Sequence, residues 1–119
     1  MAAASEITLR GTISALLAGS RSLAPASIVN TNSPAQVIQI TLAAGANTIT
    51  VPANAVGVIV LFDPTSTTVK TLKGLNADTG IVVSKNKMLV LTFDSPPTAS
   101  FVLDSTGADT GKTTEITFF

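Results

Sequence analysis

Apolar and polar residues alternate along most of this chain, and that alternation constrains the fold more than any other feature. In the stretch EITLRGTISALL, the apolar residues Ile7, Leu9, Ile13 and Leu17 fall mostly on one face of an extended strand. Similar runs rich in Thr, Val and Ile recur, with turn residues about every 8–12 positions, as in all-β domains. The pattern predicts a single all-β sandwich of about eight or nine short antiparallel strands, with jelly-roll or Greek-key-like connectivity.

The same pattern gives expectations for domain organisation and for individual strands. We expect residues 1–119 to form one sandwich domain, with residues 1–5 as a possible N-terminal arm. Strand SLAPASIVNTN should break near Pro25, because proline removes a backbone donor. Stretch AQVIQITLAAGANTITVPA predicts a β-hairpin that turns at residues 45–47. Segment TGADTGKTT predicts the loop of a second hairpin, which joins ASFVLD to TEITFF.

Several residue types that carry common enzyme chemistry are missing. The 119 residues include no Cys, His, Trp or Tyr, so thiolate and imidazole catalysis and a zinc site are not expected. Charged residues make up 12% of the chain and the formal net charge is zero, which favours association over repulsion between copies. The five Lys and two Arg are scattered, so we expect no nucleic-acid surface. The N-terminus does not resemble a signal peptide, and no apolar run is long enough to span a membrane.

Two short motifs nonetheless resemble catalytic or binding signatures. Residues 106–113 approach the phosphate-binding pattern GxxxxGK[ST], but Thr106 stands where the first glycine belongs and a strand-like sequence follows instead of a helix. Asp78 and Asp109 each begin an Asp-Thr-Gly triplet, the signature of dimeric aspartic proteases. Both triplets lie late in the chain and neither follows an apolar strand, so turn formation is the favoured interpretation. We therefore expect no catalytic, cofactor-binding or metal-binding residues.

The remaining carboxylates leave one question open. Aspartates follow several of the predicted strands, and loop carboxylates of a sandwich can bind calcium, although no EF-hand spacing is present. Solvated loop ends are the favoured interpretation. The residues concerned are Asp63, Asp78, Asp94, Asp104 and Asp109.

Two places carry more apolar surface than one sandwich needs. The stretch AVGVIVLFD is apolar on both faces, so Ile59 and Leu61 should face a partner chain or a second layer of this one. The adjacent Phe118 and Phe119 must point to opposite sides of a strand, and we expect the outward ring to be exposed or to anchor an interface. These four residues form the predicted interface.

The chain also resembles a known class of proteins. The segments VNTNSPAQVIQITLAAGANTITVPANAVGVIVLF, TVKTLKGLNADTGIVVSKNKMLVLTFD and TASFVLDS, followed by TEITFF, are similar to small β-sandwich virion structural proteins of tailed bacteriophages, of the capsid decoration (cement) type. The resemblance covers roughly residues 28–119. It implies a non-enzymatic protein on the capsid surface that forms a homotrimer, binds the major capsid protein and stabilises the head lattice. It implies no cofactor, nucleic acid, membrane or small-molecule substrate.

Two alternatives share these sequence features. A tail or fibre component of the virion would have the same composition and strand pattern. A surface- or glycan-binding β-sandwich module is a further alternative, but such modules usually stack sugars on exposed aromatic rings. This chain has five Phe and no Trp or Tyr, which disfavours it.

Overall fold

The computed structural model describes residues 5–16, 19–30, 36–75, 77–93 and 100–119, and the side chains from residue 36 onward. All ten regular elements in these residues are strands, which confirms the predicted all-β class. Their bounds are β1 Ser5–Leu16, β2 Gly19–Asn30, β3 Gln36–Ile40, β4 Gly45–Thr50, β5 Gly57–Leu61, β6 Lys70–Lys73, β7 Ile81–Val83, β8 Met88–Thr92, β9 Ser100–Ser105 and β10 Thr114–Phe118. The described part of the chain contains no helix that is long and apolar enough to span a membrane.

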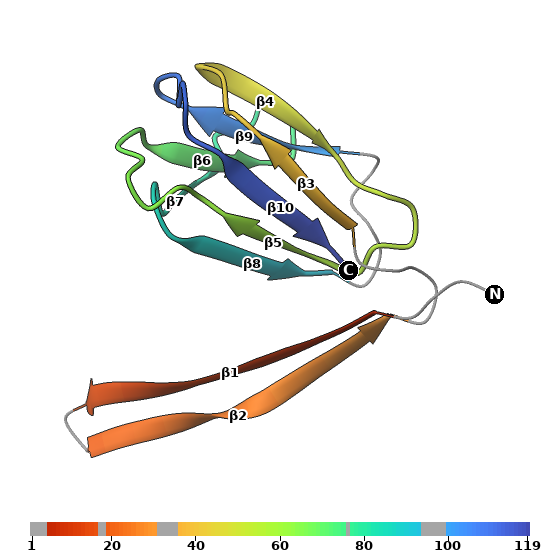
Figure 1. The fold of residues 1–119 in the computed structure, drawn as a ribbon, viewed down its shortest axis with the longest axis vertical. Coiled ribbons are helices and arrows are strands. Elements are labelled where there is room, and N and C mark those ends of the chain that lie inside the picture. The colour runs from red at the N-terminus through yellow and green to blue at the C-terminus, as the bar shows by residue number, and fades with distance from the viewer. Residues whose placement is uncertain (1–4, 17–18, 31–35, 76, 94–99) are drawn as a thin grey trace.

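Eight of the strands form two packed sheets with jelly-roll connectivity. One sheet has the order β3-β10-β5-β8 and the other has the order β4-β9-β6-β7, and every pairing is antiparallel (Figure 1). Most connections among these eight strands cross from one sheet to the other, and of the eight only β6 and β7 are consecutive strands that pair. An eight-stranded double sheet with this order is a jelly roll. The sequence left jelly roll and Greek key open, and the strand order selects the former.

Both hairpins predicted within the sandwich are wrong for the same reason. β3 and β4 lie in different sheets, as do β9 and β10, so neither segment joins hydrogen-bonded neighbours. The 41–44 connection is instead closed locally by Asn47, whose side chain accepts from Ala43 N at 2.9 Å and donates to Ala43 O at 2.9 Å. A period-two pattern defines each strand, but it does not choose the partner strand.

The first two strands form a separate antiparallel hairpin. β1 and β2 pair with each other from Ser5–Asn30 to Leu16–Gly19, and within the described residues they pair with no strand of the sandwich. Figure 1 shows them beside the sandwich, beyond β8. The sandwich sheets thus begin at Gln36, and the single domain over 1–119 stays a prediction. Residues 1–4 of the predicted arm lie outside the described residues, and Ser5 begins β1.

Pro25 does not break the second strand. The register shifts between Leu9–Ala26 and Gly11–Leu23, so two residues of β2, Ala24 and Pro25, stand opposite Arg10. Such a bulge leaves one backbone group unpaired, which is where a strand tolerates a residue without an N–H. β2 therefore runs without interruption across the proline.

The hydrophobic core lies between the two sheets. Alternate residues of each strand point inward, and in β5 these are Val58 and Val60, both fully buried. Ile116 and Phe118 from β10 lie beside them, and Phe101 and Leu103 from β9 come from the opposite sheet. Together the buried members of the core are Leu42, Ile49, Val51, Ala55, Val58, Val60, Phe62, Phe101, Leu103, Ile116 and Phe118.

Candidate functional site: the outer face of the β3-β10-β5-β8 sheet

The strand predicted to be apolar on both faces is β5, and it lies inside its sheet between β10 and β8. Because Val58 and Val60 point into the core, Ile59 and Leu61 lie on the outer face. Leu61 remains 47% exposed and Ile59 is half-buried. The structure therefore places these two predicted residues together on an outer surface, and their role as an interface stays a prediction.

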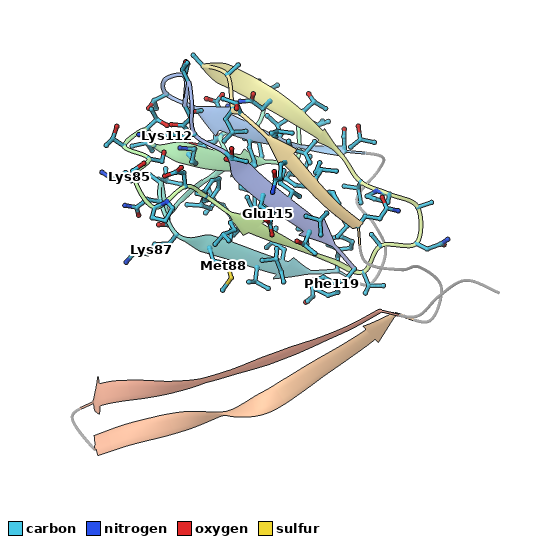
Figure 2. All side chains as sticks on the ribbon, viewed as in Figure 1. Lys85, Lys87, Met88, Lys112, Glu115 and Phe119 are labelled. Carbon is cyan, nitrogen blue, oxygen red and sulfur yellow. The ribbon has the colours of Figure 1, made fainter. Side chains whose placement is uncertain are left out.

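Neighbouring strand β8 enlarges this surface. The register pairs Ile59 with Val90 and Leu61 with Met88, and directly paired residues share a face. Met88 is 55% exposed and Val90 is half-buried, and Figure 2 shows Met88 at the surface. We call Ile59, Leu61, Met88 and Val90 the apolar patch. Sequence reasoning missed the two β8 residues because the strand order that brings them beside β5 cannot be read from alternation.

The outer face of the other sheet is mostly polar. Cross-strand pairs place Thr48 beside Val102 and Thr71 beside Asp104. The Lys73 ammonium lies 3.2 Å from the Asp104 carboxylate, and both side chains are partly exposed. Val102 is buried on this face, between its cross-strand partners Thr48 and Lys73. At the β7 edge of the same face, Val82 pairs with Thr71 and is 70% exposed. We call the part of this surface formed by Thr48, Thr71, Lys73 and Asp104 the polar face.

The expectation that the outward ring of Phe118 and Phe119 is exposed is wrong, and the alternative that it anchors an interface stays a prediction. Phe118 is a core residue with 2% exposure, as its inward position in β10 requires. Phe119 pairs with Gly57 through two backbone hydrogen bonds of 3.1 Å and is 1% exposed. The missing side chain at Gly57 makes room for its ring, since a Cβ there would lie 2.3 Å from Phe119 Cζ. Both rings are thus buried within the chain.

In the second Asp-Thr-Gly triplet the aspartate is buried, whereas Thr110 and Gly111 are exposed. Asp109 is 4% exposed and its carboxylate lies 2.9 Å from the Lys70 ammonium, which is fully buried. The same carboxylate accepts hydrogen bonds from Ser66 Oγ at 3.1 Å and Thr68 Oγ1 at 3.0 Å. Lys70 also donates to both hydroxyls and lies 5.5 Å from the centre of the Phe62 ring. A buried charge pair needs such satisfied neighbours to be tolerated.

These contacts decide the ionisation of Asp109. Burial raises the pKa of the Asp109 carboxyl, but hydrogen bonds from Lys70, Thr68 and Ser66 lower it more, so the pKa falls below its ordinary value. The carboxylate is therefore charged at neutral pH and fully engaged by donors. It holds the 106–113 loop against β6 as part of the fold.

The first triplet has another environment. Asp78 is exposed, and its carboxylate accepts the Leu75 backbone N–H at 2.7 Å in the turn between β6 and β7. Gly80 and Gly111 close the two triplets with nearly the same backbone angle, φ +76° and +77°. Asp109 contacts Lys70, the first residue of β6, whereas Asp78 lies in the turn after the last residue of β6. The two carboxylates therefore lie at different ends of β6 and do not meet within one chain.

The segment that resembles a phosphate-binding loop leads into strand β10 rather than a helix. Lys112 N donates to Asp109 O at 2.9 Å, which closes a tight turn at Gly111. The Lys112 ammonium donates to Thr65 O at 2.7 Å. Without a helix N-terminus, the segment lacks the feature that binds phosphate in such loops.

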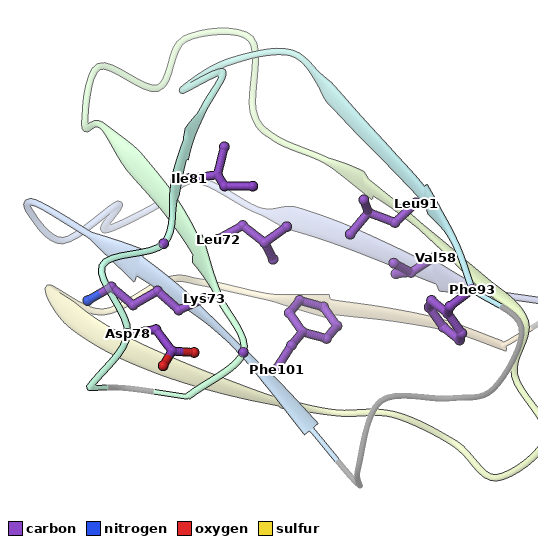
Figure 3. Close-up of a pocket in the computed structure, with 10 residues that line it drawn as sticks. Val58, Leu72, Lys73, Asp78, Ile81, Leu91, Phe93 and Phe101 are labelled. Atoms are coloured by element: carbon purple, nitrogen blue, oxygen red, sulfur yellow. The ribbon is translucent and has the colours of Figure 1, made fainter.

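An apolar cleft of about 460 Å³ opens where the edge strands β7 and β8 part, and no sequence pattern predicted it. Leu72, Ile81 and Leu91 line it, together with Val58, Phe93 and Phe101 (Figure 3). At its rim, Asp78 is bonded to Leu75 N and Lys73 is paired with Asp104. A cleft of about 470 Å³ opens at the opposite edge, between β3 and β4. Both offer apolar surface without a convergent set of polar groups.

The loop carboxylates do not gather in the described part of the chain. Among these residues, no three carboxylates lie where they could share a metal ion. Asp63 accepts both the backbone N–H and the hydroxyl of Thr65, and these bonds lower the pKa of its carboxyl. Asp94 lies outside the described residues.

Comparison with known proteins adds no relative. No protein-family model, no curated protein and no solved structure matches this chain.

Proposed function

We propose that this protein is a non-enzymatic structural component of a tailed-phage virion, a decoration protein that binds the head lattice and stabilises it. The observation that carries the proposal is the contrast between the two outer faces of the sandwich. One face carries the Lys73–Asp104 ion pair among threonines, with exposed Val82 at its β7 edge. The other face groups the apolar patch of Ile59, Leu61, Met88 and Val90 on two paired strands, beside Glu115 and Thr117 of β10. An apolar surface of this kind on one side of a small domain is typical of a protein contact.

The surroundings of the two Asp-Thr-Gly triplets support a non-enzymatic role. An aspartic protease needs two carboxylates that share a proton at an accessible site. Asp109 is instead buried against Lys70 and held by three side chains, while Asp78 bonds a backbone N–H of its own turn. Each carboxylate has a structural role in the fold, and neither faces the apolar patch.

Decoration proteins act by mechanical means. Many copies bury apolar surface against coat subunits and against each other, and repeated contacts of moderate size add up over a lattice. The zero net charge of this chain lowers the repulsion that would oppose crowding on a shell. We expect a homotrimer on the capsid surface, with the apolar patch covered by protein.

The test uses heads of the encoding phage that were assembled without this protein. Adding the full chain should give many bound copies per head and should raise the temperature at which heads release their DNA. The variant Leu61→Lys should bind weakly, whereas Thr48→Lys on the polar face should bind like the wild type. The proposal fails if the chain neither binds heads nor occurs in purified virions.

A further inference from the structure

We propose that the β1–β2 hairpin of one copy covers the apolar patch of a neighbouring copy, so that exchanged hairpins link the subunits. This inference rests on the proposed function in one respect: it takes the outer face of the β3-β10-β5-β8 sheet to be a protein contact. It adds the identity of the segment that covers that face, namely a second copy of residues 5–30.

The first support is that the hairpin needs a packing partner. Two antiparallel strands alone are marginally stable in water, and a third strand or a packing layer is needed to hold them. In the described residues β1 and β2 pair only with each other. Their register joins apolar to apolar residues at Ile7–Ile28 and Leu9–Ala26, and polar to polar at Thr8–Ser27. By strand alternation, the two apolar pairs belong to one face of the hairpin before the bulge, whereas Glu6–Val29 and Ile13–Arg21 are mixed pairs.

The second support is that the apolar patch is suited to packing against another β-sheet. Leu61 and Met88 are each about half exposed, at 47% and 55%, and their cross-strand neighbours on β5 and β8 are apolar as well. Sheet-on-sheet packing buries such a face, as it does inside the sandwich. A two-stranded hairpin matches the width of the β5–β8 pair.

The third support is length, which favours a neighbouring copy. Each hairpin strand has 12 residues, which at about 3.3 Å per residue is roughly 40 Å. β5 and β8 have five residues each, or roughly 17 Å. The hairpin is therefore more than twice as long as the surface it would cover and can reach past its own sandwich.

The absence of cysteine from the chain allows a direct test by cross-linking. Full-length Leu9→Cys, carrying a mass tag, is mixed with untagged Leu61→Cys and treated with a short bis-maleimide. Hairpin exchange predicts a covalent dimer of one tagged and one untagged chain. The matched control replaces Leu61→Cys with Thr48→Cys on the polar face, and its yield of mixed dimer should be at least tenfold lower.

Two results would overturn the proposal. One is a mixed-dimer yield no higher than that of the Thr48→Cys control. The other is that the double variant Leu9→Cys/Leu61→Cys links only within single chains, which would mean that each hairpin covers its own sandwich. Each variant is first compared with the wild type by circular dichroism. If Leu9→Cys does not fold, Ile7→Cys, which pairs with Ile28, takes its place.

The experiment uses purified chain without heads, so its outcome is separate from that of the head-binding test. Cross-linking without head binding would leave hairpin exchange standing and reject the decoration role. Head binding without cross-linking would reject hairpin exchange alone.

Discussion

The two outer faces of the sandwich differ although the two sheets are built alike. Each sheet has four antiparallel strands, and each contributes an inward set of apolar side chains to one core. On the outside, one sheet carries the Lys73–Asp104 pair among threonines, whereas the other carries the apolar patch. The core accounts for the inward residues of both sheets. We attribute the apolar patch to a further contact, because an outer face that is solvated is commonly polar in an antiparallel sandwich.

The interior that supports both faces should respond most strongly to substitution. Asp109→Ala removes the partner of fully buried Lys70 and leaves its charge unpaired, so we expect a loss of about 3–5 kcal/mol in the free energy of unfolding. Urea unfolding followed by circular dichroism measures this loss. Asp78→Ala, in the exposed copy of the same triplet, should cost about 1 kcal/mol or less.

A paired replacement sharpens that result. Lys70→Met/Asp109→Leu removes both charges at once and should be near neutral or stabilising relative to the wild type, and therefore more stable than Asp109→Ala. Neither residue lies on an outer face. Each of these variants that folds should therefore have the same apolar patch and the same polar face as the wild type. A double variant as unstable as Asp109→Ala would show that the pair is not the source of the loss.

Acidification should weaken the same interior. The pKa of Asp109 is lower in the folded chain than in the unfolded chain, so its contribution to stability is complete above the ordinary aspartate pKa near 3.8. That contribution is lost as the pH falls through the depressed folded value. Unfolding measured from pH 6 to pH 2 should show a smaller loss in Lys70→Met/Asp109→Leu than in the wild type. Equal pH dependence in the two proteins would contradict the assignment.

An intermediate effect on the free energy of unfolding is expected in the β3-β10-β5-β8 sheet. Gly57→Ala puts a Cβ into the space of the Phe119 ring, 2.3 Å from Cζ, and 3.0 Å from Leu91 O. Displacing the ring should cost about 1–3 kcal/mol, as overpacking does elsewhere. Thermal unfolding measures it. Removing the ring with Phe119→Ala in the same chain should relieve the added clash, so the two substitutions should be less than additive.

The smallest effect is expected on the polar face. Asp104→Asn removes a partly exposed ion pair with Lys73, and such pairs contribute about 0.2–1 kcal/mol. The variant should unfold nearly like the wild type, and the small difference should shrink at high salt. It should leave any association between copies unchanged, because the polar face makes no contact in this account. A change in association would break the contrast between the faces.

The sequence predicted the strands well and their partners poorly. Alternation is a local property, so it located β5 and placed Ile59 and Leu61 on the face of that strand opposite to the face that carries Val58 and Val60. Strand order depends on long-range packing, so the expected hairpins at 36–50 and 100–118 proved to be crossings between sheets. The same limit hid Met88 and Val90, which join the patch only because β8 pairs with β5.

Burial was the other property that the sequence did not reveal. The two Asp-Thr-Gly triplets share their glycine conformation, yet only Asp109 meets a buried lysine. The outward ring of Phe118 and Phe119 was expected to be exposed or to anchor an interface, but the missing side chain at Gly57 gives the Phe119 ring a buried place. In both cases a residue distant in sequence decides the environment.

The most direct test of the central claim, that the apolar patch is a contact between copies of this chain, is the solution mass measured by light scattering over a range of concentrations. Wild type, Leu61→Lys and Thr48→Lys are compared at neutral pH. The account predicts that wild type and Thr48→Lys associate to the same extent and that Leu61→Lys remains monomeric. It is contradicted if Leu61→Lys associates like the wild type, or if the wild type itself is monomeric at every concentration.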